Sequence, residues 1–288
     1  MRFTVYLTKQ GVEGLAVGGP NGELHGLTVN DAGYPGSLQS LIAKGPDALK
    51  AAAAKLAGGP AVDPEAITYL PPLQSPPKII CVGLNYSEHT KESGFEPPSY
   101  PTVFGRFASS LVGHRAPIVR PRVSDQLDYE GELVAVIGKS GRNIPAARAL
   151  DHVIGYSIFN EGSIRDYQFK APQWTVGKNF DNTGGFGPVF VTADELPPGA
   201  SGLHIQTRLN GQVVQDANTS EMIFDVANLI SILSEAITWN VGDVIVSGTP
   251  SGVGLARKPP LFMKGGDVCE VEIEGIGTLV NPIVDEAR

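Results

Sequence analysis

Short stretches in which apolar and polar residues alternate occur along most of the chain, and this period of two is typical of half-buried β-strands. The dipeptide Asn210-Gly211 between two such stretches is a strong signal for a tight hairpin turn. From Lys78 onward the stretches predicted as strands are KIICVG, TVFGRF, QLDYEGELVAVIG, DHVIGYSIFN, GPVFVTA, LHIQTRLN, QVVQDA, GDVIVSG, DVCEVEIEG and GTLVNPI.

Helical spacing is clear in one segment of this region, DVANLISILSEAITW, with Asp225 as a suitable N-cap. The chain as a whole is therefore predicted to be a β-rich α+β protein. The apolar stripe of the helix consists of Val226, Leu229, Ile230, Leu233 and Ile237.

Residues 1–70 are predicted to form a small N-terminal domain, with FTVYL, GLAVG and ELHGLTV as strands and SLQSLIAKG and PDALKAAAAKLAGG as helices. Four prolines follow within residues 70–78, LPPLQSPPK, and proline fits neither a sheet interior nor a helix interior. This segment is predicted as a linker, and residues 71–288 as the main domain.

Composition excludes several classes of protein. The net charge of −8 and the lack of a basic run argue against nucleic acid as a partner. No apolar run approaches the roughly 20 residues that span a bilayer, so no membrane partner is expected. Two cysteines, Cys81 in an apolar run and Cys269, give no disulfide framework. With no signal peptide recognised, we expect a cytoplasmic enzyme.

Glu130 and Glu132 are two residues apart on a predicted strand, so their side chains lie on one face, together with Asp128. The same face continues as apolar valines, and two carboxylates in such surroundings repel each other unless a cation such as Mg²⁺ or Mn²⁺ binds them. Glu161 is the predicted third ligand, with Asp166 as a second candidate. The alternatives are an acidic edge strand in solvent and a helix N-terminal acid at Glu161.

His89 and Glu92 are three residues apart on a predicted short helix, so they lie side by side. A carboxylate that orients an imidazole makes it a better base, which predicts a pair able to deprotonate water. The alternative is an exposed helix with a chance neighbour. No histidines have the spacing of a zinc site.

The glycine-rich residues 247–254, SGTPSGVG, lack the lysine of a phosphate-binding loop, but their backbone N–H groups and Thr249 can approach a carboxylate or carbonyl. Lys178 lies between apolar residues and can stabilise a substrate anion or an oxyanion. By themselves, a plain turn and a surface lysine are the alternatives. No serine-type nucleophile motif is present.

The order of these motifs closely resembles the fumarylacetoacetate hydrolase superfamily over roughly residues 76–283. The motifs are CVGLNYSEHTKE, LDYEGELVAVIGK, GYSIFNEGSIRDYQ, WTVGKNF, MIFDVANLI and GDVIVSGTPSGVG. The resemblance implies a mixed β-sandwich roll, a homodimer, a Mg²⁺ or Mn²⁺ site, and a variable domain at residues 1–70.

The resemblance also implies roles for individual residues. The metal would be bound by Glu130, Glu132 and Glu161, although the family usually has Asp at the last position. The other implied roles are His89 and Glu92 as the water-activating pair on a lid helix, Lys178 as the group that polarises a substrate oxygen, Arg165, Gln168 and Thr249 as contacts of the oxo-acid end, and Arg106 as a further contact.

These assignments predict an enzyme that hydrolyses a carbon–carbon bond in a small acylpyruvate-type 1,3-dioxo acid and releases pyruvate and a carboxylic acid. The alternative is a decarboxylase, isomerase or hydratase that acts on oxaloacetate or a ring-cleavage oxo acid at the same metal site. A further alternative is a binding module that kept the fold and lost activity, because fold alone does not separate these functions.

Overall fold

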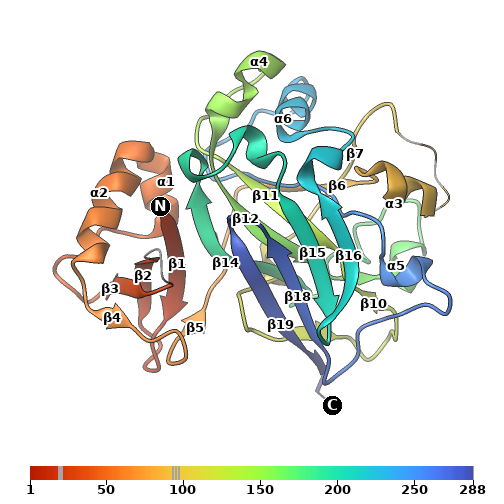
Figure 1. The fold of residues 1–288 in the computed structure, drawn as a ribbon, viewed down its shortest axis with the longest axis horizontal. Coiled ribbons are helices and arrows are strands. Elements are labelled where there is room, and N and C mark those ends of the chain that lie inside the picture. Colours follow the sequence, from red (N-terminus) through yellow and green to blue (C-terminus); the bar gives the residue numbers. More distant parts are fainter. Residues whose placement is uncertain (19–21, 93, 95, 97, 288) are drawn as a thin grey trace.

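The computed structural model describes residues 1–18, 22–92, 94, 96 and 98–287. Two β-sheets pack face to face and short helices lie around them, so the predicted β-rich α+β class is confirmed (Figure 1). The helices are α1 (Leu38–Lys44), α2 (Pro46–Ala57), α3 (Ser87–Glu92), α4 (Ala146–Ala149), α5 (Arg165–Gln168) and α6 (Val226–Ser234).

The large sheet has twelve strands in the order β4-β3-β2-β1-β14-β12-β11-β17-β6-β7, with β5 beside β1 and β8 beside β14. Its strands are β1 (Arg2–Leu7), β2 (Glu13–Gly18), β3 (Leu24–Thr28), β4 (Ala61–Val62), β5 (Thr68–Tyr69), β6 (Ile79–Gly83), β7 (Thr102–Gly105), β8 (Leu111–Val112), β11 (Gly131–Ile137), β12 (Val153–Glu161), β14 (Gly184–Thr192) and β17 (Val244–Val246).

The small sheet has five strands in the order β16-β15-β18-β19-β9, and β10 pairs with β13. Asn210 and Gly211 both have positive φ in the turn between β15 and β16, so the predicted hairpin is confirmed. The strands of the small sheet are β9 (Ile118–Arg120), β15 (His204–Leu209), β16 (Gln212–Asn218), β18 (Val268–Ile273) and β19 (Gly277–Asp285), and the separate pair consists of β10 (Leu127–Asp128) and β13 (Ser163–Ile164).

The main core lies between the two sheets. Leu133 and Ile158 of the large sheet pack in one buried cluster with Ile205 and Val271 of the small sheet. Burial of each such side chain contributes about 1.5–3 kcal/mol before entropy is subtracted. Helix α6 adds Val226, Leu229, Ile230 and Leu233 to the same cluster, whereas Ile237 of the predicted stripe lies beyond the end of the helix and outside the cluster. Asp225 caps the helix by accepting a hydrogen bond from Asn228 N at 2.8 Å.

The N-terminal strands continue the large sheet, because β1 pairs with β14 through Arg2–Val191 and Phe3–Phe190. Phe3 also belongs to the same buried cluster as Phe159 of β12. The division at residue 70 stays a prediction, but the two parts share a sheet and a core. Residues 70–78 contain no helix or strand, as predicted for a linker.

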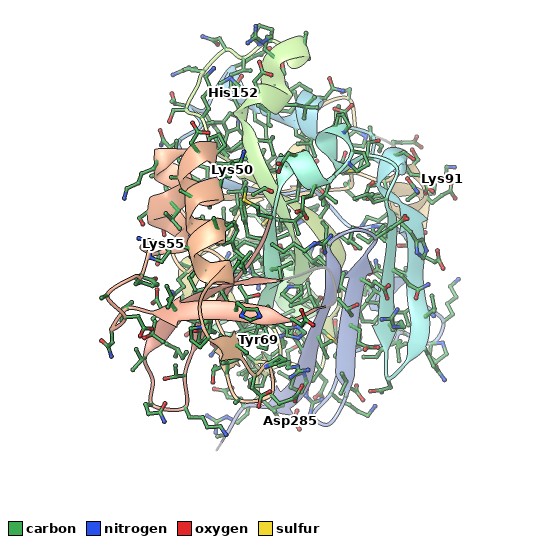
Figure 2. The ribbon with its side chains drawn as sticks, turned by 60° about the vertical axis from the view of Figure 1, so that its left-hand side comes forward. Lys50, Lys55, Tyr69, Lys91, His152 and Asp285 are labelled. Carbon is green, nitrogen blue, oxygen red and sulfur yellow. The ribbon has the colours of Figure 1, made fainter. Side chains whose placement is uncertain are left out.

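Helix α2 shows why the N-terminal segment folds as it does. Leu49 and Leu56 are buried on the inner face of the helix, whereas Lys50 and Lys55 are exposed on the outside (Figure 2). Pro46 is the first residue of the helix and Gly58 caps its end, the arrangement that proline and glycine favour at helix ends. Among the described residues, no helix combines the length and apolar character needed to cross a bilayer.

The prediction of one continuous strand over residues 126–138 is wrong. The chain pairs first with β13, through β10, and then with β12, through β11, and it changes partner at Tyr129 and Glu130. Gly131 permits the change, because a Cβ there would lie 2.3 Å from the Thr207 hydroxyl of the small sheet. Glu130 therefore sits at a strand break rather than within a regular strand.

The hydrogen bond between His114 and Val280 of β19 is expected to be lost in acid. Nδ1 of His114 accepts a hydrogen bond from Val280 N at 3.1 Å, which requires the neutral ring, and burial together with Arg115 lowers the pKa of His114 to about 4. Because the unfolded chain binds this proton more readily, stability contributed by the neutral ring is present above pH ~6.5 and is lost as the pH falls toward ~4.

Over that window the loss reaches up to about 3 kcal/mol. We expect His114→Asn, whose amide oxygen can still accept from Val280 N, to show a flatter dependence of unfolding free energy on pH. Urea unfolding of both proteins at several pH values between 7 and 4 measures the difference. Parallel curves would contradict the assignment.

Candidate active site

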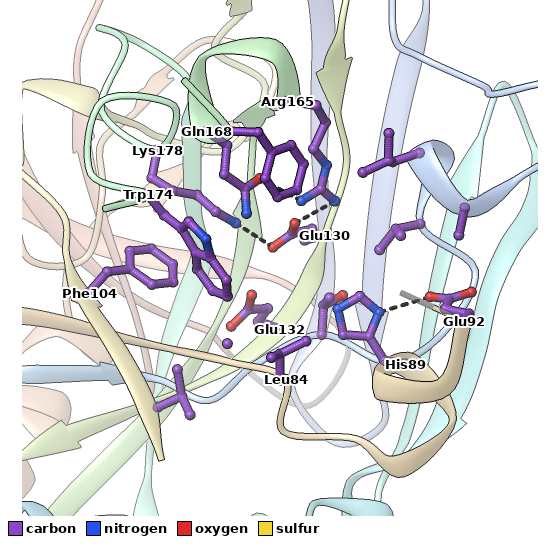
Figure 3. Close-up of a pocket in the computed structure, with 17 residues that line it drawn as sticks. Leu84, His89, Glu92, Phe104, Glu130, Glu132, Arg165, Gln168, Trp174 and Lys178 are labelled. Carbon is purple, nitrogen blue, oxygen red and sulfur yellow. Dashed lines mark hydrogen bonds and ion pairs between the residues drawn. The ribbon is translucent and has the colours of Figure 1, made fainter. Parts of the chain in front are cut away.

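A small cavity of about 180 Å³ opens where β6, β11, α3, α5 and the glycine-rich segment 247–256 meet (Figure 3). It gathers most of the residues predicted from the sequence. The lining residues are Val82, Gly83, Leu84, His89, Glu92, Phe104, Glu130, Glu132, Arg165, Gln168, Phe169, Trp174, Lys178, Thr249, Val253, Leu255 and Ala256.

His89 and Glu92 form a hydrogen bond at this cavity, with His89 Nδ1 2.8 Å from Glu92 Oε1. Both carboxylate oxygens of Glu92 also accept from Gly252 N, at 3.0 and 2.9 Å, so the glycine-rich segment holds the carboxylate in place. His89 is buried, so the alternative of an exposed helix with a chance neighbour is wrong. Within the described part of the chain, no hydrogen bond engages Nε2 of His89.

Glu130 is held between two cations. Its carboxylate lies 2.8 Å from Lys178 Nζ and 2.6 Å from Arg165 Nη2, and all three side chains are buried. Burial would raise the pKa of Glu130, but Arg165 and Lys178 outweigh it and lower the pKa to about 2. Glu130 is therefore ionised at neutral pH, and Lys178 is not the surface lysine that its sequence context alone favours.

The pKa of Glu132 is shifted in the opposite direction to that of Glu130. Burial raises the pKa of Glu132 well above its usual range, and the nearby Glu161 and Glu130 raise it further. Its Oε2 accepts from Gly248 N at 2.5 Å. Glu161 is fully buried; its Oε1 binds Arg106 Nη1, while its Oε2 has no hydrogen-bond partner among the residues that the structure describes. Neighbouring carboxylates with an unpartnered oxygen make an electrostatically unsatisfied cluster.

The fit of a divalent cation follows from this cluster. As the side chains stand, no group of three histidine, cysteine or carboxylate side chains in the described chain is arranged around a metal position. Glu130 and Glu161 are instead turned to Lys178, Arg165 and Arg106. Carboxylate oxygens are the donors that Mg²⁺ and Mn²⁺ prefer, and a cation would relieve the repulsion that raises the pKa of Glu132. The donor set Glu130, Glu132 and Glu161 fits such an ion chemically.

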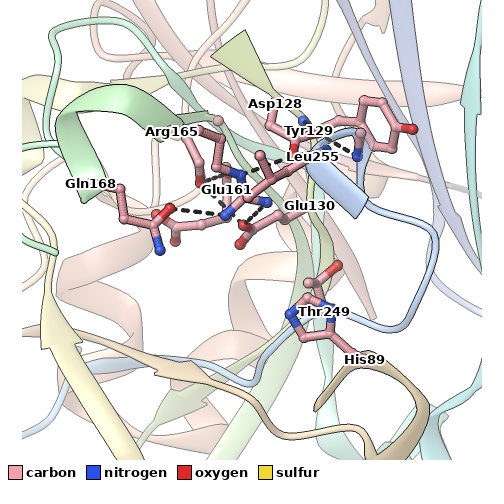
Figure 4. A network of polar contacts seen from close by, with 12 residues as sticks. His89, Asp128, Tyr129, Glu130, Glu161, Arg165, Gln168, Thr249 and Leu255 are labelled. Carbon is pink, nitrogen blue, oxygen red and sulfur yellow. Dashed lines mark hydrogen bonds and ion pairs between the residues drawn. The ribbon is translucent and has the colours of Figure 1, made fainter. Parts of the chain in front are cut away.

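Asp128 does not belong to this carboxylate group, contrary to the prediction that it shares its face. It accepts from Arg165 Nε at 2.8 Å and from the backbone N–H groups of Gly254 and Leu255 at 2.8 and 2.9 Å (Figure 4). Asp128 and Glu130 contact different nitrogens of Arg165, Asp128 at Nε and Glu130 at Nη2. Asp128 thus anchors Arg165 beside the cavity. Asp166, the second candidate for the third ligand, accepts a hydrogen bond from Ser124 Oγ at 2.5 Å and does not line the cavity.

The predicted substrate contacts divide into two groups. Arg165, Gln168 and Thr249 line the cavity, and Arg165 Nη1 donates to Gln168 Oε1 at 2.9 Å. Arg106 does not line it: its side chain is completely buried and binds Glu161 and the Thr183 hydroxyl. A direct contact between Arg106 and substrate would require the Glu161 pair to separate.

Three aromatic residues of the cavity have no counterpart in the sequence predictions: Phe104, Phe169 and Trp174. Phe104 and Trp174 meet edge to face with ring centroids 5.9 Å apart, and Lys178 Nζ lies 5.0 Å from the centre of the Phe104 ring. Trp174 stands four residues before Lys178 in the motif WTVGK, which was the available signal. The contact with Phe104 comes from a distant strand, so local patterns do not reveal it.

The Arg106–Glu161 pair gives a stability prediction. Removal of one partner from a buried ion pair typically costs about 3–5 kcal/mol, because the other charge remains buried without compensation. We expect Arg106→Met to be destabilised by that amount in urea unfolding with a chelator present, and Arg106→Met combined with Glu161→Gln to recover most of it. A loss below about 1 kcal/mol in Arg106→Met would contradict the expected cost of breaking this buried pair.

Comparisons with known proteins agree with this geometry. The family model described as fumarylacetoacetate (FAA) hydrolase C-terminal matches residues 78–284. A protein of Xenopus laevis named as a mitochondrial oxaloacetate tautomerase is 41% identical over 266 residues, which cover 91% of this chain and 83% of that protein. A human protein with a corresponding name is 40% identical, over 94% of this chain and 87% of its own length.

Solved structures agree as well. The fumarylacetoacetate hydrolase of the psychrophilic Exiguobacterium antarcticum superposes with a TM-score of 0.86 at 36% identity and covers 99% of this chain and 100% of its own. A 5-carboxymethyl-2-hydroxymuconate delta-isomerase of Mycobacterium smegmatis superposes with a TM-score of 0.76 at 30% identity, over all of both chains. With its motifs, sheets and cavity in agreement, this chain belongs to the fumarylacetoacetate hydrolase family of enzymes.

Proposed function

We propose that this enzyme interconverts the keto and enol forms of oxaloacetate or a closely similar small 2-oxo dicarboxylic acid. One observation carries the proposal: a single small cavity holds an imidazole oriented by a carboxylate, His89–Glu92, together with the buried cations Lys178 and Arg165. Proton transfer beside a carbonyl needs these two components, a base and a cation near the oxygen. The names of the relatives support this alternative over hydrolysis.

Binding of the substrate is assigned to Arg165, Gln168 and Thr249. A guanidinium is suited to a carboxylate because its N–H donors form a planar fork. Asp128 and Gln168 hold that guanidinium at Nε and Nη1, which fixes its plane. The cavity is small, as expected for a four-carbon acid.

In the reaction, the C3–H bond of the keto acid breaks, its electron pair forms the C2–C3 double bond, and the C2 oxygen becomes an anion that then takes up a proton. His89 accepts the C3 proton at Nε2, since Nδ1 is bonded to Glu92. Lys178 stabilises the anionic oxygen. Figure 3 shows Lys178 and His89 on opposite sides of the cavity, with Glu130 and Glu132 between them.

A bound Mg²⁺ or Mn²⁺ would be held by Glu130, Glu132 and Glu161. When bound, such an ion supplies Lewis-acid polarisation of the substrate oxygens. The unpartnered Oε2 of Glu161 and the raised pKa of Glu132 support this assignment. Lys178 would then be released from Glu130 to face substrate.

Hydrolysis of an acylpyruvate is the second candidate, and the His89–Glu92 pair is the observation that favours it. An oriented imidazole can deprotonate a water molecule as readily as a carbon acid. The same base would then direct attack on the distal carbonyl and release pyruvate. Decarboxylation of oxaloacetate requires no such base, so it depends less on this pair.

The test is one panel of assays on the purified protein with Mg²⁺, Mn²⁺ or chelator. Loss of the enol form of oxaloacetate is followed by ultraviolet absorbance, and pyruvate is measured from oxaloacetate, acetylpyruvate and fumarylpyruvate. Rapid enol–keto exchange with little pyruvate is the expected result. Pyruvate from an acylpyruvate at a higher kcat/KM than tautomerisation would replace the proposal by the hydrolase assignment.

A further inference from the structure

We infer that Trp174 is the residue that determines substrate length: it closes one side of the cavity and restricts the proposed reaction to short oxo acids. This inference rests on the proposed function for the identity of the substrate class. The arrangement of the wall itself is independent of that proposal, because it follows from packing around the indole ring.

Trp174 is carried by residues 169–176, a loop that leaves α5 and returns at Gly177. The ends of the loop are in close contact, since a Cβ on Gly177 would lie 2.3 Å from Gln168 N. Gly177 O also accepts from Ile164 N at 2.8 Å, which fixes the returning chain beside β13. Phe169 and Val176, near the two ends, are exposed, whereas Trp174 is turned into the cavity.

Asn179 ties this loop to the edge strand of the large sheet. Its side-chain nitrogen donates to Thr175 O in the loop at 2.8 Å and to Gly105 O of β7 at 3.0 Å. Its side-chain oxygen accepts from Phe107 N at 2.6 Å. One side chain therefore holds the loop against β7, with Trp174 beside Phe104. The three hydrogen bonds of the Asn179 side chain thus position the loop that carries the indole.

Gly83 at the end of β6 is the surface on which the indole rests. A Cβ at Gly83 would lie 2.4 Å from one ring carbon of Trp174, which is closer than side-chain carbons come to one another, and 3.0 and 3.5 Å from two others. The backbone of β6 and the indole are thus in direct contact. Together with Phe104, Trp174 forms an aromatic wall on that side of the cavity.

Beyond this wall, Glu130 and Glu132 lie toward the middle of the cavity and His89 lies on its far side (Figure 3). An oxo acid with its reacting carbons among these groups directs the rest of its chain either toward this wall or toward the mouth. Each added methylene that meets a fixed wall costs about 10- to 200-fold in selectivity. A four-carbon acid avoids this penalty, whereas six-carbon oxo acids and acylpyruvates with bulky acyl groups meet the wall.

The experiment compares wild type, Trp174→Phe and Trp174→Ala by calorimetric titration with oxaloacetate, 2-oxoglutarate and 2-oxoadipate at fixed Mn²⁺. We expect wild type to bind the four-carbon acid at least 10-fold more tightly than the six-carbon acid, and Trp174→Ala to lose most of that ratio. Trp174→Phe should be intermediate. A ratio in Trp174→Ala within threefold of wild type, or wild type binding without discrimination, would overturn the inference.

Fluorescence provides the structural control. The chain has two tryptophans, and the other, Trp239, is fully buried, with its indole N–H donating to Ile230 O at 3.1 Å. Trp174 variants that keep the Trp239 emission of a folded core are folded. In Trp239→Phe, addition of oxaloacetate should change the emission of Trp174, and an unchanged emission at saturating ligand would place the ligand elsewhere.

Binding and turnover separate the two proposals. If Trp174→Ala abolishes the preference for short acids but the wild type has no tautomerase activity, the inference about Trp174 is supported and the proposed reaction is refuted. Tautomerase activity in wild type with an unchanged length preference in Trp174→Ala would do the reverse.

Discussion

Replacement of Glu132 by alanine is expected to lower kcat/KM for oxaloacetate by about 10³-fold or more, because a bound cation contributes several kcal/mol of charge stabilisation at a substrate oxygen. Burial raises the pKa of Glu132, and the charges of Glu161 and Glu130 raise it further. A cation bound here restores the ionised form of Glu132, so loss of this carboxylate should also remove Mn²⁺ binding in calorimetric titration.

Glu132→Gln is the matched control. Its amide oxygen can still accept from Gly248 N, which donates to Glu132 at 2.5 Å, so the glycine-rich segment keeps its position while the charge is removed. We expect this variant to fold with wild-type or greater stability and to bind Mn²⁺ poorly. Wild-type activity after exhaustive chelation, or unchanged Mn²⁺ affinity in Glu132→Ala, would remove the metal from the proposed mechanism.

Replacement of His89 by alanine is expected to slow tautomerisation by about 10²- to 10⁴-fold, the range typical of a lost general base. Glu92→Gln should lose a similar factor, because the carboxylate that orients the ring through Nδ1 and anchors it to Gly252 is neutralised. Mn²⁺ affinity should stay unchanged, since neither residue belongs to the proposed donor set. Measurements of rate and of Mn²⁺ binding on the same preparations separate the two roles.

Decarboxylation of oxaloacetate in the same His89→Ala sample serves as the internal control, and it should fall less than tautomerisation. A tautomerisation rate within about threefold of wild type is too small a change for a lost general base. That result would assign proton transfer to another group and would favour a decarboxylase.

The local pattern of residues determined the elements and several of their contacts. Period-two alternation predicted the longer strands of both sheets but not the short β4, β5, β8 and β9, and helical spacing with Asp225 as cap predicted α6. Such features depend on a few consecutive residues, so they can be derived without knowledge of the fold. The hydrogen bond between His89 and Glu92 could also be derived locally, because two residues three positions apart on a helix are neighbours on its surface.

The order of the motifs indicated the fumarylacetoacetate hydrolase family, and the family model and the solved structures confirmed it. It led first to a carbon–carbon hydrolase, whereas the named relatives favour the alternative of an isomerase acting on oxaloacetate. Hydrolysis, decarboxylation and tautomerisation share one set of side chains, so motifs alone do not separate them. The homodimer and the cytoplasmic location stay predictions.

Sequence by itself thus indicated the residues that are proposed to carry the chemistry, and tertiary structure decided which charged groups and aromatic side chains surround them. Glu130 faces Lys178 and Arg165, and Glu161 faces Arg106, because β6, β11 and β12 bring separate stretches of chain together. The pairing with Arg165 and Lys178 lowers the pKa of Glu130. Trp174 reaches the cavity through a loop that packs on Gly83, and such contacts depend on sheet order and close packing, which have no local signature.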